Sequence, residues 1–169
     1  WDRLDRLIEV DVDDVVSTYA YYADTWMRKT KDVDGTVTTY VYDGFAVIGV
    51  TTGGVYAAYV VPDIYPIWEE TDGDVLVYTT DVRESVTGLW NGTGFEKTFE
   101  YDPYGKVASF DADGESISST SGPRYRAQMY DAETGHLYLR YRYLDTDLGR
   151  FINPDPIGYK GGLNLYKYV

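Results

Sequence analysis

The 169-residue sequence has the length of one ordinary domain and can bury a sizeable core. It carries 15 Lys and Arg against 28 Asp and Glu, and the resulting net charge of −13 repels phosphate backbones and anionic lipids. Nucleic-acid binding and docking on a membrane surface are therefore not expected. The sequence contains no Cys, which excludes disulfides, a thiol nucleophile and cysteine-ligated zinc.

The sequence does not have the composition of a disordered acidic tail, because 44% of its residues are hydrophobic and 17% are aromatic. Its 19 Tyr are apolar along the ring and polar at the hydroxyl, which suits half-buried faces of β-sheets. The longest uninterrupted apolar run, residues 55–61, is far too short to span a membrane. The chain opens in the middle of a pattern, without a signal peptide, as expected of a piece of a longer protein.

A short unit repeats along residues 1–110. An aromatic residue followed by Asp or a near equivalent recurs, and the first three copies are 20 and 21 residues apart. The copies are Trp1-Asp2, Tyr21-Tyr22, Tyr42-Asp43, Tyr101-Asp102 and, further on, Tyr130-Asp131. Gly-containing turns at 34–35, 43–44, 53–54, 72–73 and 91–92 separate β-rich runs. This pattern predicts degenerate β-hairpins in series over residues 1–110.

Helix signals are poor throughout, because no apolar pattern with a period of 3.6 persists for three turns. Residues 111–123 combine acidic residues, Ser, Thr, Gly and a closing Pro123, which predicts an exposed loop. The predicted fold class is therefore all-β, with serial antiparallel hairpins and little helix.

The last segment, residues 124–169, reads as strands separated by turns. Asp131 to Gly135 is a polar turn that ends in Gly, and residues 137–143 then alternate with the period of two that predicts one strand. Residues 147–149 break that strand. Two prolines then flank Asp155 and hold it in an extended, turn-bound backbone.

This segment resembles a known family. The order YDAETGHLYLRYRY, LGRFINPDPIGYK and GGLNLYKYV is similar to the RHS-repeat-associated core of bacterial Rhs proteins, WapA-like proteins and the C component of Tc toxins. The spacing of the earlier units resembles the YD repeats of the same proteins. The resemblance implies that residues 1–110 form YD-repeat hairpins of a hollow β-shell and that residues 124–169 form its core segment.

Asp155 and Arg142 are the candidate site residues. By residue type alone, Asp155 caps a turn and Arg142 is a solvated strand residue. The resemblance implies instead that both descend from an aspartyl self-cleavage site, in which two carboxylates share one proton. The family's second Asp falls beyond Val169, so the sequence predicts a remnant site and no enzyme activity for this chain. The longer parent is then the candidate self-cleaving protease.

The sequence signals for other kinds of functional site are weaker. The acidic clusters, such as 111–115, lack the spacing of a calcium loop and are ordinary turn signals. His136 is the single His, so neither a multi-histidine metal site nor a triad with a second His can form. No cofactor and no metal are predicted.

Two function hypotheses follow. The first is a structural and encapsulation module, the C-terminal portion of an Rhs-type β-shell whose partners are the rest of that shell and a C-terminal toxin cargo. The second is a self-assembling extracellular or adhesive protein, because a hairpin of about twenty residues needs neighbours and leaves two open sheet edges. Both hypotheses place a bacterial protein outside the cell, secreted or on its surface.

Overall fold

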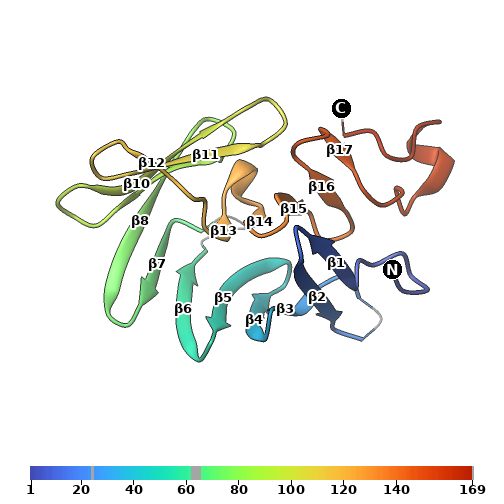
Figure 1. Ribbon diagram of the computed structural model, residues 1–169, viewed down its shortest axis with the longest axis horizontal. Helices are drawn as coiled ribbons and strands as arrows, with labels where there is room; N and C mark the ends of the chain where they lie inside the picture. The colour runs from blue at the N-terminus through green and yellow to red at the C-terminus, as the bar shows by residue number, and fades with distance from the viewer. Residues whose placement is uncertain (24, 62–65, 169) are drawn as a thin grey trace.

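The computed structural model describes residues 1–23, 25–61 and 66–168. Twelve strands form one antiparallel sheet in which spatial order follows chain order (Figure 1). They are β1 (Glu9–Val12), β2 (Val15–Tyr21), β3 (Arg28–Val33), β4 (Thr36–Asp43), β5 (Ala46–Thr52), β6 (Val55–Val60), β7 (Trp68–Thr71), β8 (Asp74–Thr80), β9 (Val86–Trp90), β10 (Phe95–Tyr101), β11 (Val107–Asp111) and β12 (Ser116–Ile117). The predicted serial hairpins are confirmed.

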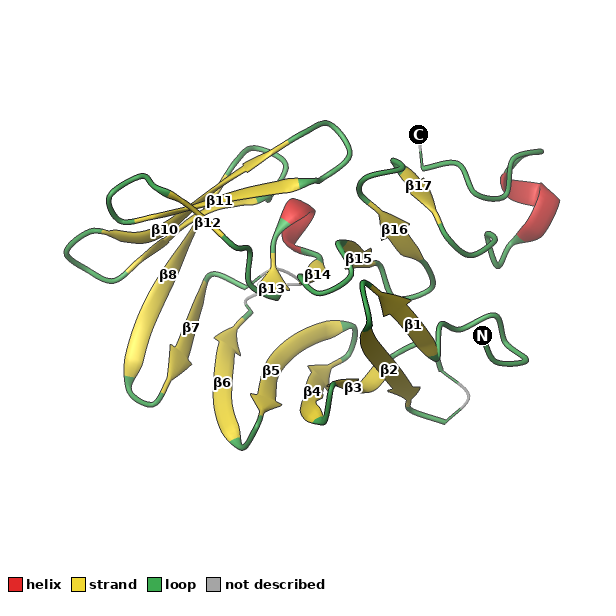
Figure 2. Cartoon of the chain, in the orientation of Figure 1, coloured by secondary structure: helices red, strands yellow, loops and turns green. Residues whose placement is uncertain are grey.

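A second antiparallel sheet of five strands follows, again in chain order. It contains β13 (Gly122–Pro123), β14 (Met129–Asp131), β15 (His136–Tyr138), β16 (Tyr143–Asp145) and β17 (Arg150–Phe151). The helices of the described chain are two single 3-10 turns, η1 (Tyr125–Ala127) and η2 (Gly158–Gly161), drawn in red in Figure 2. The all-β prediction with little helix is confirmed.

The aromatic–Asp unit has a local physical cause. At Asp2, Asp81, Asp102 and Asp111, one carboxylate oxygen accepts hydrogen bonds from the backbone N–H groups two and four residues later, at 2.8–3.0 Å. The third residue after each Asp has a positive φ, as at Gly105 with 92°. The Asp thus closes a tight five-residue turn, and before three of these Asp residues, all but Asp81, an aromatic residue stands, of which Tyr101 packs against the main core.

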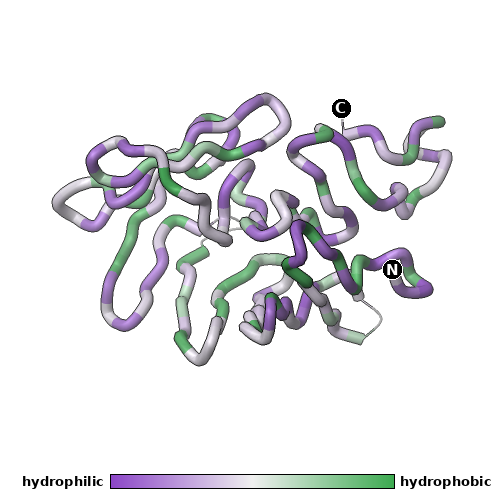
Figure 3. The backbone as a smooth tube through the Cα atoms, viewed as in Figure 1, coloured by the Kyte–Doolittle hydropathy of each residue, from purple (hydrophilic) through white to green (hydrophobic). Residues whose placement is uncertain are grey.

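The large sheet is curved, and the second sheet lies on its concave side (Figure 1). We call this concave side the inner face and the opposite side the outer face. The main core contains Tyr19, Tyr40 and Tyr59 from the large sheet together with Met129 and Tyr143 from the small one. Figure 3 shows apolar stretches along β5 and β8 and polar residues at the hairpin ends. The small sheet therefore covers the inner face of the large one.

The structure differs from the sequence prediction in two segments. The single strand expected over residues 137–143 is wrong, because β15 ends at Tyr138 and β16 starts at Tyr143. Arg140 breaks the strand with a φ of 62°, a backbone conformation that no regular strand contains. Residues 111–123, predicted as an exposed loop, contain β12 and β13, and Pro123 is buried.

Candidate functional site

The structure brings together the two residues that the sequence singled out. Arg142 Nη1 lies 2.9 Å from Asp155 Oδ2, and both side chains are about one-fifth exposed, at 24% and 20%. The other carboxylate oxygen of Asp155 accepts a hydrogen bond from the Ile157 N–H at 3.0 Å. The Gly158 N–H donates to the Asp155 carbonyl at 2.9 Å. Asp155 therefore caps a turn with one oxygen and binds Arg142 with the other.

Arg142 is not the solvated strand residue that its sequence context suggested. It lies in the break between β15 and β16, and its guanidinium carbon is 3.6 Å from the centroid of the Phe151 ring. Burial lowers the pKa of Arg142 from its ordinary value, although the Asp155 carboxylate opposes this shift. The partly buried guanidinium has lost some of its hydration, and the Asp155 carboxylate compensates for part of that loss.

Asn153 fixes the backbone on both sides of Arg142. Its side-chain Nδ2 donates to the Tyr141 carbonyl at 2.9 Å, and its Oδ1 accepts from the Tyr143 N–H at 3.0 Å. Asn153 is 3% exposed. The sequence gives no signal for this positioning residue, because its two backbone partners lie 10 and 12 residues away.

A cleft opens beside the Arg142–Asp155 pair. Residues 158, 161–165, 167 and 168 complete its lining, and among the described residues Asp155 is its only carboxylate. General acid–base catalysis on a peptide by aspartate requires a second carboxylate that can share a proton with the first. The cleft of this chain thus contains one half of such a pair, and the catalytic role of Asp155 and Arg142 stays a prediction.

A second ionic site lies buried between the two sheets. Arg28 on β3 makes a bidentate ion pair with Asp131 on β14, with Nη1–Oδ2 at 2.5 Å and Nη2–Oδ1 at 3.0 Å. Lys31 Nζ lies 3.0 Å from the same carboxylate and 2.8 Å from Glu133. The side chains of Arg28 and Asp131 are 0% and 1% exposed. We call these four residues the inter-sheet ion cluster.

Aromatic residues enclose the Arg28 guanidinium. Its carbon lies 5.5 Å, 4.5 Å and 4.6 Å from the ring centroids of Tyr19, Tyr40 and Tyr138. The Tyr138 hydroxyl accepts a hydrogen bond from the backbone N–H of Arg28 at 2.8 Å. Burial alone would raise the pKa of Asp131, but the Arg28 and Lys31 cations outweigh it and hold that pKa below its ordinary value. Asp131 is therefore ionised, and its buried ion pair with Arg28 binds the two sheets together, whereas Lys31 and Glu133 also line a cavity beside it.

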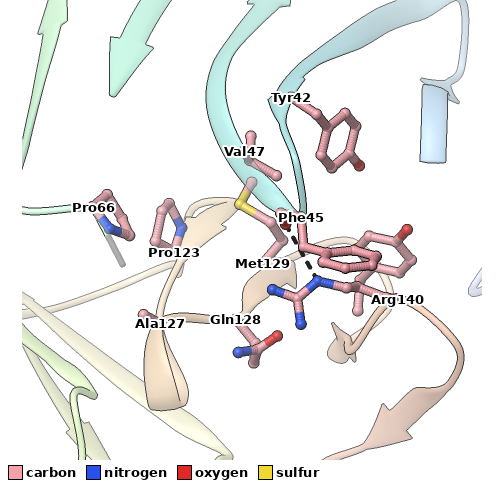
Figure 4. A pocket seen from close by; sticks show the side chains of 10 residues that line it. Tyr42, Phe45, Val47, Pro66, Pro123, Ala127, Gln128, Met129 and Arg140 are labelled. Carbon is pink, nitrogen blue, oxygen red and sulfur yellow. Dashed lines mark hydrogen bonds between the residues drawn. The ribbon is translucent and has the colours of Figure 1, made fainter. Parts of the chain in front are cut away.

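A shallow hollow lies where the β4–β5 hairpin meets the small sheet (Figure 4). Tyr42, Val47 and Met129 line it, and Arg140 donates from Nε to the Phe45 carbonyl at 3.3 Å. Among the described residues, no group of three or more His, Asp or Glu is placed to bind a metal ion. Within the same part of the chain, no helix has the length and apolar character that a membrane crossing requires.

The fold and the site define a class of protein: a serial-hairpin sheet that wraps a smaller core sheet, with a Pro-Asp-Pro turn whose Asp155 pairs with Arg142. No family model matches the chain. A search of curated proteins finds Double-stranded DNA deaminase toxin A of Burkholderia cenocepacia, 43% identical over 71 residues, and Probable deoxyribonuclease RhsA of Dickeya dadantii, 42% identical over 55 residues. It also finds Toxin subunit YenC2 of Yersinia entomophaga, 32% identical over 110 residues.

These matches cover 41%, 32% and 60% of this chain but only 5%, 4% and 11% of the relatives, so the chain spans a small part of each. Among solved structures, the crystal structure of TcdB2-TccC3-Cdc42 has a TM-score of 0.74 at 20% identity, over 100% of this chain and 9% of that one. The chain is thus similar in sequence to toxin proteins that include RhsA and YenC2, and its fold is that of the corresponding part of TcdB2-TccC3-Cdc42.

Proposed function

We propose that this chain is a structural module of a toxin-associated β-shell, and that in the whole protein it closes the shell around a C-terminal toxin. The observation that carries the proposal is the placement of the small sheet on the inner face of the curved large sheet (Figure 1). A hairpin series alone leaves its inner face open, whereas here Met129, Tyr138 and Tyr143 of the small sheet pack into it.

The inter-sheet ion cluster supports this role. A covering segment must stay attached to the wall, and Arg28 and Asp131 join two elements 103 residues apart in sequence. The Tyr19 and Tyr143 rings, 5.6 Å apart between centroids, add an apolar contact across the same boundary. The toxin relatives that match the chain are consistent with cargo beyond its C-terminal end. We place the whole protein outside the bacterial cell, secreted or on its surface.

Protease protection tests the proposal. The full open reading frame that carries this chain is expressed, and any polypeptide downstream of it is followed during digestion with a nonspecific protease. We expect the downstream segment to survive in the wild type and to be degraded in Arg28→Met. Lys106→Met, which removes the exposed Lys106–Asp147 pair, is the matched control and retains protection. A wild type that leaves its downstream segment fully digestible would refute the shell function.

The second candidate is self-assembly through open sheet edges. One edge of the large sheet is β1, and its exposed side chains are Glu9 and Asp11. Charges on an edge strand oppose pairing with another copy. Size-exclusion chromatography discriminates the two candidates, because edge-to-edge assembly predicts species larger than the monomer at high protein concentration.

A further inference from the structure

A row of apolar side chains crosses five strands on the outer face. Strand register places each member beside the next: Val60 opposite Trp68, Trp68 opposite Val77, Val77 opposite Trp90, and Trp90 opposite Phe95. These five residues belong to neither apolar core. We call this row the outer ridge.

The alternation in β8 shows that both faces of this strand are apolar. Leu76 and Tyr78 point to the inner face and join the main core. Val75 and Val77 point outward and are 45% and 43% exposed. Apolar residues on both faces are typical of strands that are covered on both sides. The inner cover is present in the structure, whereas on the outer ridge Val77 and Phe95 are 43% and 41% exposed and the other three members are half-buried.

The aromatic end of the outer ridge is preorganised. The Phe95 ring lies directly over Gly88, where an added Cβ would come within 2.7 Å of it. Trp90 and Phe95 pack edge to face, with ring centroids 5.2 Å apart and an interplanar angle of 80°. Rings that are already fixed lose little conformational entropy when a partner covers them, and Trp is enriched at the energetic centres of interfaces.

The charges beside the outer ridge are all of one sign. Glu70, Glu96 and Glu100 are exposed on the same strands. Lys97, the single cation of strands β6–β10, pairs in register with the buried Leu89 and so belongs to the inner face. An apolar row with carboxylates beside it and no cation on its face complements a partner that has an apolar stripe bordered by Lys or Arg.

We propose that the outer ridge binds a basic amphipathic helix of a partner protein. Neighbouring strands are about 4.8 Å apart, so the ridge is roughly 19 Å long. A helix with apolar residues at i, i+4, i+7 and i+11 advances about 5.4 Å per turn and matches this length in three to four turns. A second copy of this chain, with net charge −13, and an anionic membrane are both repelled by the flanking carboxylates. The inference is independent of the shell function.

The probe is a fluorescent synthetic helix of about 18 residues with a Leu stripe between Lys borders, and its binding is measured by fluorescence anisotropy. We expect Val77→Ser and Trp90→Ser each to weaken binding by about tenfold, because both remove ridge contacts. Val37→Ser is the matched control. Val37 is 43% exposed, like Val77, and lies on the outer face of β4, away from the ridge. It should change affinity by less than about twofold. Thermal melting confirms that all three variants are folded.

Other outcomes would overturn the proposal. The proposal is wrong if the basic helix does not bind, or if an analogue with Glu in place of Lys binds equally well. It is also wrong if Val37→Ser weakens binding as much as Val77→Ser does. Binding to anionic vesicles that Val77→Ser abolishes would assign the ridge to a membrane instead. Dimerisation abolished by the same change would assign it to a second copy.

Discussion

Replacing Arg28 by Met removes the cation that faces Asp131 in the inter-sheet ion cluster while keeping most of the side-chain volume. The Asp131 carboxylate, which is 1% exposed, then keeps Lys31 at 3.0 Å but loses its bidentate partner. Breaking one side of a buried ion pair costs about 3–5 kcal/mol. The remaining Lys31 places the expected cost near the lower end, and the lost stacking on three Tyr rings adds to it.

Urea unfolding measures this loss. We expect Arg28→Met and Asp131→Asn each to lower the free energy of unfolding by about 3 kcal/mol or more. The double variant should lose less unfolding free energy than the two single variants together, because the second change removes the charge that the first change left buried without its partner. Lys106→Met is the control, and its unfolding midpoint should match the wild type because its ion pair with Asp147 is exposed. Single variants that each cost less than about 1 kcal/mol, or a strictly additive double variant, would refute the reasoning.

The same cluster predicts a direction for pH dependence. The pKa of Asp131 is lower in the folded chain than its ordinary value of 3.8, so folding favours the ionised carboxylate. Its contribution to stability is complete above the ordinary pKa and is lost as pH falls through the lower folded-state value. The difference in unfolding free energy between the wild type and Asp131→Asn should therefore be constant near neutral pH and shrink in acid. A difference that grows on acidification would contradict the assigned charge state.

Three further predictions follow from local geometry. Gly105 and Gly114 occupy the same position of two Asp-closed turns, but a Cβ at Gly105 would lie 2.8 Å from the Tyr125 ring whereas Gly114 has open space. Gly114→Ala should thus cost about 1–2 kcal/mol for its positive φ and Gly105→Ala clearly more, and equal losses in urea unfolding would contradict the clash. Burial lowers the pKa of His136 below its ordinary 6.5, so the stability that this neutral group contributes is present above pH 6.5 and is lost as pH falls through the lower folded-state pKa. His136→Gln should flatten the wild-type decline below pH 6.5, and an unchanged slope would exclude His136 as its source. In a chain extended beyond Val169 through the next Asp-Pro element, Asp155→Asn and Arg142→Met should abolish self-cleavage as followed by gel electrophoresis, and cleavage that continues unchanged in Asp155→Asn would dismiss the assignment.

The predicted fold was correct where local chemistry decides it. Asp-Gly and Gly-Gly pairs placed the turns, and alternation between them placed the strands, because a hairpin needs only neighbouring residues. The strand expected over residues 137–143 was wrong for the opposite reason. Its alternation is regular, but the positive φ of Arg140 and the two hydrogen bonds that the Asn153 side chain makes, one donated and one accepted, depend on segments that pack around it.

The candidate site was predicted only in part. The Pro-Asp-Pro element identified Asp155 as a turn residue, and its Oδ1 does cap that turn. The pairing of its other oxygen with Arg142 depends on how β16 and β17 bring the two turns together. Asn153 was missed because its two backbone partners lie 10 and 12 residues away.

The sequence by itself determined that this chain is a series of hairpins, because Asp, Gly and alternating apolar residues act within a few positions of one another. Only the tertiary structure decided what Asp131 does. In the Tyr101-Asp102 unit, the Asp carboxylate closes its own turn. In the Tyr130-Asp131 unit, the Asp carboxylate instead binds Arg28, which lies 103 residues away in the sequence. A buried carboxylate must find a cation, and the curvature of the large sheet determines which cation is within reach.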